Sequence, residues 1–456
     1  MNTAATLPDL FDAPVEDRLA FAITEIASRF PQRAAFVVDA GSAGRRTIDY
    51  ASLAAMVADF EKRVDELRPV GVVARARRVD ALVAIAAACG RQHVPVAFLA
   101  DDARDLVGEL RDWVVVDDSL RLPEPSSAGM RSEFSPVPPN VIVATSGTSG
   151  PPRLVDHSWE SLLASARLTE QWHGRGWLLV YDATRWAGIQ VWLQSVLTGG
   201  RLVVPASREP GVVLEAIVAE EVAIIPGTPT LLRQLLTMKD RGLLERAKVD
   251  RITLGGEAAD ASILEQAARA FPQAKITHVY ATTELGEVFR VTDGRPGFPA
   301  TWLGRALPGG SRLSVRRDGE LLVQLSRDSA EVGTGDLIER VGDRYVFTGR
   351  RSDVIVVGGQ KVYPRRIEEI LRGVRGVADA RVYGLPSAAT GELVAAEMVL
   401  ADPMPAELSP GGVRADALAA CRAAVEQHAV PRILDIVRRI TTTAAGKVPR
   451  RQIGRA

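Results

Sequence analysis

The feature that most constrains the fold is a unit that recurs along the chain. It consists of a short apolar strand, a turn of glycine or hydroxyl residues, and a segment with helical spacing. The apolar segments 141–144, 251–254 and 276–280 each end in such a turn. Alternation of helices with short apolar strands is typical of layered α/β domains. Ligands bind at the carboxyl ends of strands in such sheets, so we expect the three turns to share one crevice.

The turn after segment 141–144 has the composition of a phosphate-binding loop. It contains two glycines, four hydroxyl residues and a cation, and reads Thr145, Ser146, Gly147, Thr148, Ser149, Gly150, Pro151, Pro152, Arg153. Glycine lets backbone N–H groups approach phosphate oxygens, and hydroxyls supply further donors. The Gly-Lys-Ser/Thr ending of a Walker loop is absent, which excludes the P-loop NTPase pattern. The turn is predicted to hold a polyphosphate, and a polar surface turn is the alternative.

The chain of 456 residues is too long for one core, so several domains are expected. Helical spacing is found at 51–67 and 159–172, and 82–89 is apolar on every side, as in a buried helix. Past residue 300 the strands flank Asp318-Gly319, a strong hairpin signal. The predicted fold combines the α/β and α+β classes. A large N-terminal layered α/β domain with an antiparallel hairpin region covers 1–348, and a small mobile α+β C-terminal domain covers 349–456.

Composition excludes several classes of protein. Lys+Arg and Asp+Glu number 56 each, so charge gives no reason to expect nucleic acid or an anionic membrane as partner. The cysteines, Cys89 and Cys421, lie far apart, which excludes a disulfide framework and a cysteine-based zinc site and predicts the cytoplasm. The N-terminus lacks the basic start and apolar core of a signal peptide. The longest apolar run, 81–89, is too short to span a membrane.

Six motifs in a fixed order give the chain a family resemblance. They are TSGTSGPPR at 145–153, GGE at 255–257, YATTE at 280–284, TGD at 334–336, GRRSDVIVVGGQKVYPRRIEE at 349–369 and TAAGKVPR at 443–450. Together they resemble the acyl-adenylate-forming (AMP-binding) superfamily, which includes acyl- and aryl-CoA ligases, adenylation domains of nonribosomal peptide synthetases and firefly luciferase. The length and the segment 349–369 look most like o-succinylbenzoate-CoA-ligase-like enzymes.

The resemblance implies an ATP-dependent acid–thiol ligase. Such an enzyme activates a small carboxylic acid, here with aryl or alkyl acids favoured, as acyl-AMP with release of pyrophosphate. It then passes the acyl group to a thiol, for which coenzyme A is expected. A stand-alone adenylation enzyme that loads the phosphopantetheine of a carrier protein is one alternative. A non-catalytic nucleotide-binding protein on the same fold is another, motivated by Arg153, Ala281 and Ser352, which depart from the residues usual in the family.

The resemblance also implies which residues neutralise charge when two anions react. The loop 145–150, with Arg153 as its cation, would hold the β- and γ-phosphates. Glu284 would bind Mg²⁺ and Thr283 the α-phosphate. The nucleotide site would also include Gly255, Gly256 and Glu257. The alternative for Glu284 is a solvated carboxylate.

Three further residues are matched to the nucleoside. Tyr280 would stack on adenine, and Asp336 would accept hydrogen bonds from both ribose hydroxyls. Arg350 would donate to ribose or phosphate. The alternatives are a buried strand tyrosine, a turn-forming aspartate and a solvated arginine.

Lys447 matches the family lysine that bridges the attacking carboxylate and the α-phosphate; a solvated lysine is its alternative. Because Lys447 and the phosphate loop fall on different predicted domains, residues 349–456 would form a lid that closes over 1–348. Ser352 and Asp353 occupy the expected hinge.

The acyl pocket is matched to Arg185, Trp186 and Gly188. Many family members have histidine at the position of Arg185. This arginine is either a counter-charge for an acidic group on the substrate or a solvated loop residue. Core packing explains Trp186 equally well.

Overall fold

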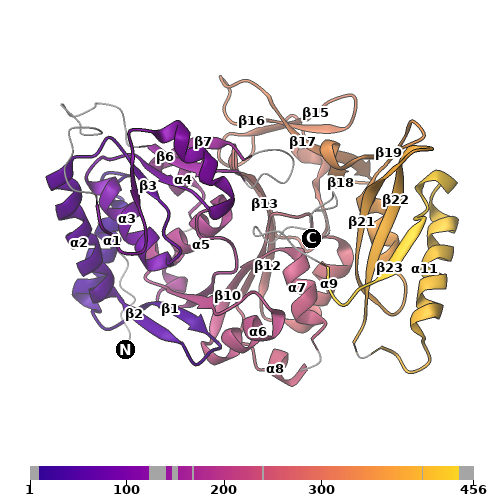
Figure 1. The fold of residues 1–456 in the computed structure, drawn as a ribbon, viewed down its shortest axis with the longest axis horizontal. Helices are drawn as coiled ribbons and strands as arrows, with labels where there is room; N and C mark the ends of the chain where they lie inside the picture. The colour runs from indigo at the N-terminus through magenta and orange to yellow at the C-terminus, as the bar shows by residue number, and fades with distance from the viewer. Residues whose placement is uncertain are drawn as a thin grey trace. The chain divides into compact units, whose positions relative to one another are not determined.

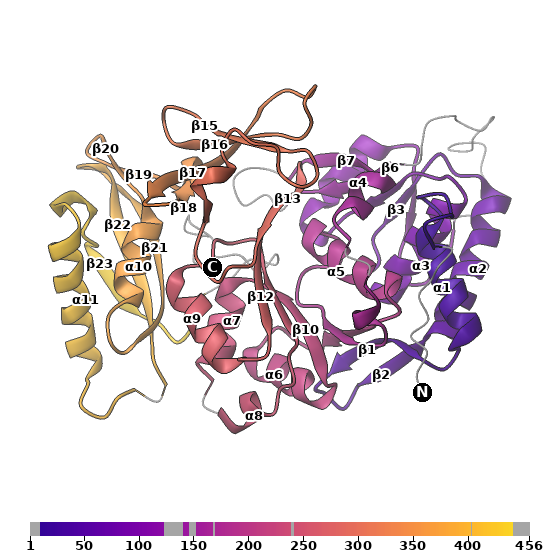
Figure 2. The ribbon, with the colours of Figure 1, turned by 180° about the vertical axis from the view of Figure 1, so that it is seen from behind.

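The computed structural model of the chain describes residues 10–122, 140–145, 152–166, 169–238, 241–402 and 404–440. The chain divides into two units, whose elements are labelled from opposite sides in Figures 1 and 2. Unit 1 comprises Met1–Gly227, Arg246–Thr253 and Ala281–Glu287. Unit 2 comprises Thr228–Glu245, Leu254–Tyr280 and Val288–Ala456. The predicted domain boundary between residues 348 and 349 stays a prediction.

Unit 1 contains two layers of mainly parallel strands. In the first layer the strands lie side by side in the order β10 (Val222–Gly227), β8 (Gly176–Leu178), β9 (Arg201–Pro205), β1 (Ala34–Ala40) and β2 (Arg46–Asp49). In the second the order is β5 (Val114–Val116), β3 (Val72–Ala74), β4 (Val96–Phe98), β6 (Asn140–Ala144) and β7 (Leu154–Ser158). The antiparallel members are β2 and β7. Short, apolar parallel strands are typical of α/β layers, which confirms the predicted class for this part of the chain.

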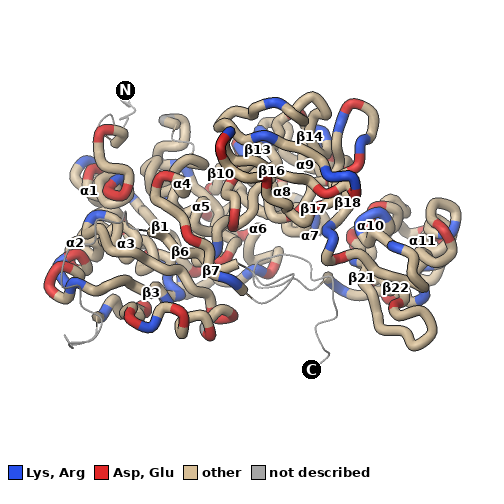
Figure 3. The backbone as a smooth tube through the Cα atoms, turned by 90° about the horizontal axis from the view of Figure 1, so that it is seen from above, with Lys and Arg blue, Asp and Glu red and all other residues tan. Residues whose placement is uncertain are grey.

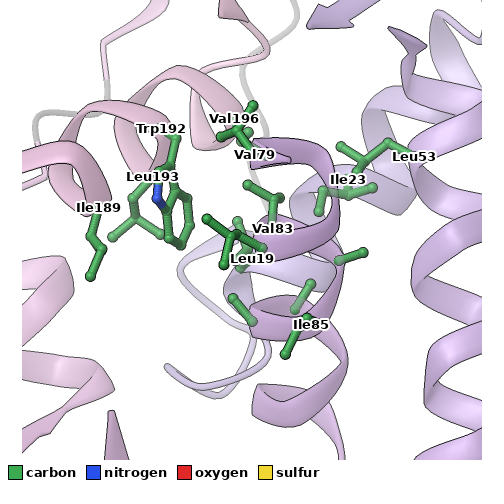
Figure 4. Close-up of a cluster of buried hydrophobic side chains, with 14 of the residues drawn as sticks. Leu19, Ile23, Leu53, Val79, Val83, Ile85, Ile189, Trp192, Leu193 and Val196 are labelled. Carbon is green, nitrogen blue, oxygen red and sulfur yellow. The ribbon is translucent and has the colours of Figure 1, made fainter. Parts of the chain in front are cut away.

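The core of unit 1 is built by helices that share one set of apolar side chains. They are α1 (Arg18–Arg29), α2 (Tyr50–Leu67), α3 (Val79–Arg91) and α5 (Trp186–Leu197). In Figure 4, Val83 of α3 lies among side chains of α1 and α5, including Leu19 and Trp192. Helix α3 is buried from Val79 to Gly90 because it is apolar on every side, which confirms the buried helix predicted at 82–89.

The remaining helical segments of unit 1 are short. They are η2 (Asp101–Leu110), α4 (Trp159–Ala164), η3 (Glu170–Trp172) and α6 (Pro210–Ala219). The single helix predicted over 159–172 is wrong, because α4 ends at Ala164 and a separate 3₁₀ turn occupies Glu170–Trp172.

Unit 2 contains two sheets, the first antiparallel and the second antiparallel except for one parallel pair of strands. The first has the order β14 (Phe298–Pro299), β18 (Arg344–Arg350), β17 (Val332–Val341), β16 (Glu320–Gln324) and β15 (Arg312–Val315). Strands β15 and β16 are joined through Asp318-Gly319, which confirms the predicted hairpin. Gly319 has φ +87°, a left-handed conformation that favours glycine.

The second sheet of unit 2 has the order β20 (Gln360–Val362), β19 (Ile355–Val357), β22 (Gly391–Leu400) and β21 (Val377–Ser387), with β23 (Ile433–Ile436) paired to β22. Helix α10 (Pro364–Arg372) packs on β21 and contacts α11 (Pro410–Ala424). Helices packed on a mainly antiparallel sheet confirm the predicted α+β part.

Other elements of unit 2 are α7 (Pro229–Leu236), α8 (Arg241–Glu245), α9 (Ala261–Ala270), η4 (Ala300–Trp302), η5 (Arg351–Asp353) and η6 (Gln427–Ala429). The chain passes between the units at β11 (Arg251–Leu254), β12 (Lys275–Thr282) and β13 (Gly286–Val291). Figure 3 shows cationic and anionic residues interspersed on both units. Among the described helices, none has both the length and the apolar character needed to cross a bilayer.

Candidate active site

A carboxylate, a phenol and a guanidinium of unit 2 meet at Asp336. Tyr280 on β12 donates its hydroxyl proton to Asp336 Oδ2 at 2.6 Å. Arg350, which pairs with Asp336 across β17 and β18, donates from Nε to Oδ1 at 2.9 Å. The structure thus brings together three residues that the sequence assigned to the nucleoside, although they are separated along the chain.

A bulge in β17 just before Asp336 explains how the carboxylate is presented. Asp336 N donates to Thr334 Oγ1 at 3.2 Å, and Thr334 Oγ1 donates to the carbonyl of Leu321 at 2.8 Å. Gly335 between them has φ +74°, which a side chain would strain. The Thr-Gly-Asp sequence therefore fixes the carboxylate through its own backbone.

In this group, which we call the Asp336 cluster, the carboxylate stabilises the protonated forms of its two partners. The carboxylate of Asp336 raises the pKa of Arg350. Burial, reinforced by the charge of Asp336, raises the pKa of the Tyr280 hydroxyl, so Tyr280 stays a donor at neutral pH. The Tyr280 ring is stacked with Phe289 and Phe347, with centroid separations of 5.1 and 5.0 Å. Stacking on adenine stays a prediction for this ring.

The predicted phosphate loop joins two antiparallel strands of unit 1. Its residues Ser146, Gly147, Thr148, Ser149 and Gly150 lie outside the described residues. Its base is described: Thr145 N donates to the carbonyl of Arg153 at 2.9 Å, and Arg153 N donates to Thr145 Oγ1 at 3.0 Å. The next pair along β6 and β7 is Ala144 with Leu154. The two ends of the loop are therefore held together by the sheet.

Arg185 is buried beside this base. Its exposed fraction is 8%, so the solvated loop arginine considered from the sequence is wrong. Nη1 donates to the carbonyls of Ala144, at 2.8 Å, and Thr145, and Nη2 forms an ion pair with Asp102. These contacts lie within unit 1 and involve backbone oxygens that sequence reasoning could not assign.

The other two predicted pocket residues begin helix α5. Trp186 is buried, and its ring lies 4.6 Å from that of His157 on β7. Gly188 lies so close to the preceding loop that a Cβ atom there would be 2.0 Å from the carbonyl oxygen of Asp182. Both residues thus have a packing role, and their contact with an acyl group stays a prediction.

The remaining predicted nucleotide residues have different surroundings. Glu257 accepts hydrogen bonds at Oε2 from Thr230 Oγ1, at 2.6 Å, and from Thr230 N, at 3.2 Å, and so stabilises the first turn of α7. Gly256, after Gly255, has φ +78°. In unit 1, Glu284 is exposed and Thr283 is half-buried. Their roles, and those of Gly255 and Gly256, stay predictions.

The predicted hinge is described, but the predicted catalytic lysine is not. Ser352 and Asp353 form part of η5, where Ser352 Oγ donates to Asp353 Oδ1 at 2.9 Å. The neighbouring Arg351 binds Asp318 and Glu320 of the hairpin region. Lys447 lies outside the described residues.

Sequence reasoning missed a second ionic group of unit 2, which we call the Asp260 cluster. Arg233 of α7 pairs with Asp260, the N-cap of α9, at 2.5 Å. Arg372 of α10 pairs with Asp379 of β21 at 2.9 Å, and its Nη1 lies 3.8 Å from Asp260. The carbonyl of Ala258 also accepts a hydrogen bond from Arg365 at 3.1 Å. In the sequence these residues stand apart as ordinary charged positions, and no pattern indicated that they pair with one another.

Burial and attraction compete in the Asp260 cluster. Burial alone would raise the pKa of Asp260, but the charge of Arg233, the amide of Ile263 and the charge of Arg372 outweigh it and lower the pKa. Burial also lowers the pKa of Arg233, and the charge of Arg372 adds to this.

Comparison with known proteins agrees with the geometry. The family described as AMP-binding enzyme matches residues 59–324, more than half of the chain, and the AMP-binding enzyme C-terminal domain matches 366–447. A relative in Rhodococcus jostii, 3-[(3aS,4S,7aS)-7a-methyl-1,5-dioxo-octahydro-1H-inden-4-yl]propanoyl:CoA ligase, is 27% identical over 278 residues, which cover 56% of this chain and 52% of that protein. A 2-succinylbenzoate–CoA ligase of Bacillus licheniformis is 25% identical over 68% of this chain and 69% of its own. The chain spans about half the length of the first curated relatives it matches.

Solved structures show the same fold. The anthranilate CoA ligase AuaEII, in complex with anthranoyl-AMP, has a TM-score of 0.72 at 17% identity, covering 97% of both chains. Fold, motif order and the extent of the family match lead to one conclusion: the chain belongs to the AMP-binding enzyme family.

Proposed function

We propose that the protein is an ATP-dependent acid–thiol ligase. It joins a carboxylic acid to AMP with release of pyrophosphate and then transfers the acyl group to the thiol of coenzyme A. The observation that carries this proposal is the Asp336 cluster. A carboxylate held by Tyr280 and Arg350 supplies acceptors for a vicinal diol, next to an aromatic ring and a cation, which is the donor and acceptor set a nucleoside phosphate needs.

Asp336 keeps acceptor capacity for a ligand. Each of its oxygens accepts one of the two hydrogen bonds described above, and a carboxylate has about four lone-pair sites. The ribose hydroxyls would use the remaining sites. Arg350, whose side chain is 36% exposed, would donate to ribose or phosphate while it stays paired with Asp336.

The phosphates would be held by the loop 145–150 and Arg153, with Thr283 at the α-phosphate. Among the described residues, no group of three or more His, Cys, Asp or Glu side chains is arranged to hold a metal. Mg²⁺ is commonly held by one or two carboxylates together with phosphate oxygens and water. Glu284 would be its protein ligand, and the ion would neutralise phosphate charge.

Lys447 would bring an ammonium group to the attacking carboxylate and the α-phosphate. The carboxylate oxygen forms a bond to phosphorus as the bond to pyrophosphate breaks. In the second step the thiolate sulfur attacks the acyl carbon and AMP leaves with the bonding electrons. Since Lys447 acts on the first step, the two half-reactions depend on it differently.

The names of the two relatives given above support aryl or cyclic acids as substrates. The test is therefore a screen of pyrophosphate release over aromatic, aliphatic and amino acids, with coenzyme A or a phosphopantetheinylated carrier protein as acceptor. Acid-dependent release and a coenzyme A thioester product are expected. Pyrophosphate release without any acid, or none with the whole panel, would contradict the proposal.

The Lys447→Ala variant tests the mechanism. We expect acid-dependent pyrophosphate release to fall about a thousandfold, since one charge that stabilises the transition state is lost. Transfer from a supplied acyl-adenylate to coenzyme A should change little. Lys62→Ala, which removes an exposed lysine of α2, is the control and should behave as wild type. Equal losses in both half-reactions of Lys447→Ala would show that its role is misassigned.

A further inference from the structure

We infer that Arg185 is a positioning residue for the phosphate loop rather than a substrate contact. The inference rests on the proposed function, because it concerns how the loop 145–150 is held ready for a nucleotide. It is carried by three features of unit 1: the burial of the guanidinium, its acceptors at the end of β6, and its ion pair with Asp102.

The guanidinium connects three elements at one point. Its Nη1 donates to two carbonyls: that of Ala144, the last residue of β6, and that of Thr145, the first residue of the loop. Its Nη2 serves Asp102 on η2, the segment that follows β4. Since β4 pairs with β6 in the same sheet, Arg185 ties the end of one strand to the segment after its neighbour.

The electrostatic reason is that carbonyl oxygens repel phosphate. A phosphate loop must present N–H groups to its ligand and direct its carbonyls elsewhere. At the entrance of this loop, two successive carbonyls are bound by one buried cation. The guanidinium therefore fixes the peptide orientation at Ala144 and Thr145 and offsets their negative ends before a nucleotide binds.

The backbone of Arg185 is itself fixed. Arg185 is the N-cap residue of α5, and its N–H donates to the carbonyl of Asp182 at 3.1 Å. The first turn of α5 can approach Asp182 because Gly188 has no Cβ atom. The backbone of Arg185 is thus held at the start of α5, and its side chain extends from there to β6.

The residue type matters at this position. Arginine presents a planar fork of donors that can serve two carbonyls and a carboxylate at once, whereas lysine presents one compact charge. A substrate counter-charge would instead leave donors directed at the ligand. Here three of the five N–H donors are directed at protein acceptors, and the charge of the guanidinium is paired with Asp102.

The first experiment measures the ligand-free protein. Hydrogen exchange at the Thr145 and Arg153 amides reports the closed base of the loop, in which both N–H groups donate. In Arg185→Ala we expect exchange of both amides to be at least about tenfold faster than in wild type. Arg45→Ala is the matched control. It removes an arginine of unit 1 that pairs with the buried Glu220 and has no contact with β6 among those described.

The second experiment separates positioning from substrate recognition. In Arg185→Ala, KM for ATP should rise about tenfold or more, while KM for the carboxylic acid changes less than about twofold. Arg185→Lys should lie between wild type and Arg185→Ala. Asp102→Asn keeps the arginine and the shape of its partner, so a smaller rise in KM for ATP is expected, and it provides the test if Arg185→Ala does not fold.

The outcomes are distinct. Unchanged exchange at Thr145 and Arg153, or a rise confined to KM for the acid, would overturn the inference. If wild type shows no nucleotide binding, the proposed function fails, whereas the exchange measurement still decides whether Arg185 orders the base of the loop.

Discussion

The Asp336 and Asp260 clusters use the same chemistry in different surroundings, and the contrast separates a binding site from a structural one. Both place an aspartate of unit 2 beside arginine. Arg350 at Asp336 has a side chain that is 36% exposed, whereas Arg233 and Asp379 of the other cluster are 7% and 9% exposed. The two carboxylates are similarly buried, with side chains that are 10% (Asp336) and 13% (Asp260) exposed, so the difference lies in their arginine partners.

The two aspartates also differ in what they bind. Asp260 accepts from the amide of Ile263 at 3.0 Å, pairs with Arg233 and lies within reach of Arg372, so its acceptors are committed to the protein. Asp336 accepts from a phenol and one guanidinium nitrogen and retains sites for further donors. A carboxylate whose acceptors are all used by buried protein donors stabilises a fold, while one that keeps free acceptor sites beside a partly exposed arginine can take a ligand.

The strongest way to break this comparison is to remove Asp260. In Asp260→Ala the buried guanidinium of Arg233 loses its hydrogen-bonded partner and keeps only the more distant Asp379, at 3.9 Å, and α9 loses its cap. We expect the free energy of unfolding to fall by about 3–5 kcal/mol, measured by urea denaturation. Asp59→Ala, which breaks the exposed pair with Arg63 on α2, is the control, and a change of at most about 1 kcal/mol is expected there.

The pH dependence of this effect identifies its cause. Because the folded-state pKa of Asp260 is lowered, its stabilising contribution is present above the unfolded pKa of about 3.9 and is lost as the pH falls through the folded value. The difference in stability between wild type and Asp260→Asn should therefore shrink in acid. A difference that stays constant would indicate packing rather than charge.

The next test removes the carboxylate of the candidate site. Asp336→Ala should lower kcat/KM for ATP about a hundredfold, which corresponds to ~2.7 kcal/mol, because the diol loses its acceptors. Its free energy of unfolding should fall by only about 1–2 kcal/mol, less than for Asp260→Ala. The comparison would fail if Asp336→Ala unfolded readily and kept its affinity for ATP, because Asp336 would then behave as a structural residue.

The smallest effect is expected for the phenol. Tyr280→Phe keeps the ring and removes the donor to Asp336 Oδ2. We expect KM for ATP to rise about threefold to tenfold, about 1 kcal/mol, with the fold intact by circular dichroism. If Tyr280→Phe weakened ATP binding as much as Asp336→Ala, the hydroxyl would orient the carboxylate in addition to donating one hydrogen bond.

Local patterns predicted local structure well. The buried helix at 82–89 followed from apolar residues on every side, and the hairpin at Asp318-Gly319 from a dipeptide that favours left-handed φ. The helix over 159–172 was wrong because its apolar spacing continues past Ala164, where the helix ends. Spacing measures amphipathicity and does not report where the backbone leaves the helix.

Such local patterns could not predict contacts between residues that are far apart in the sequence. The order of motifs placed Tyr280, Asp336 and Arg350 in one site, and the structure joins them by hydrogen bonds. By contrast, Arg185 lies 83 positions from Asp102, and no periodicity relates the two. Arg185 was considered either solvated or directed at substrate, since the burial of a charge depends on the tertiary fold.

The Asp260 cluster has a consequence for movement within unit 2. Arg372 and Asp379 lie in the region that the sequence predicts to be a lid, and Arg233 and Asp260 precede it. The ion pairs that join the two parts are Arg372 with Asp260, at 3.8 Å, and Arg233 with Asp379, at 3.9 Å, and a displacement that separates them exposes four charges to water. Dissolved ions screen hydrated charges far better than they screen buried charges. Raising the ionic strength therefore favours the arrangement in which the ion pairs are separated.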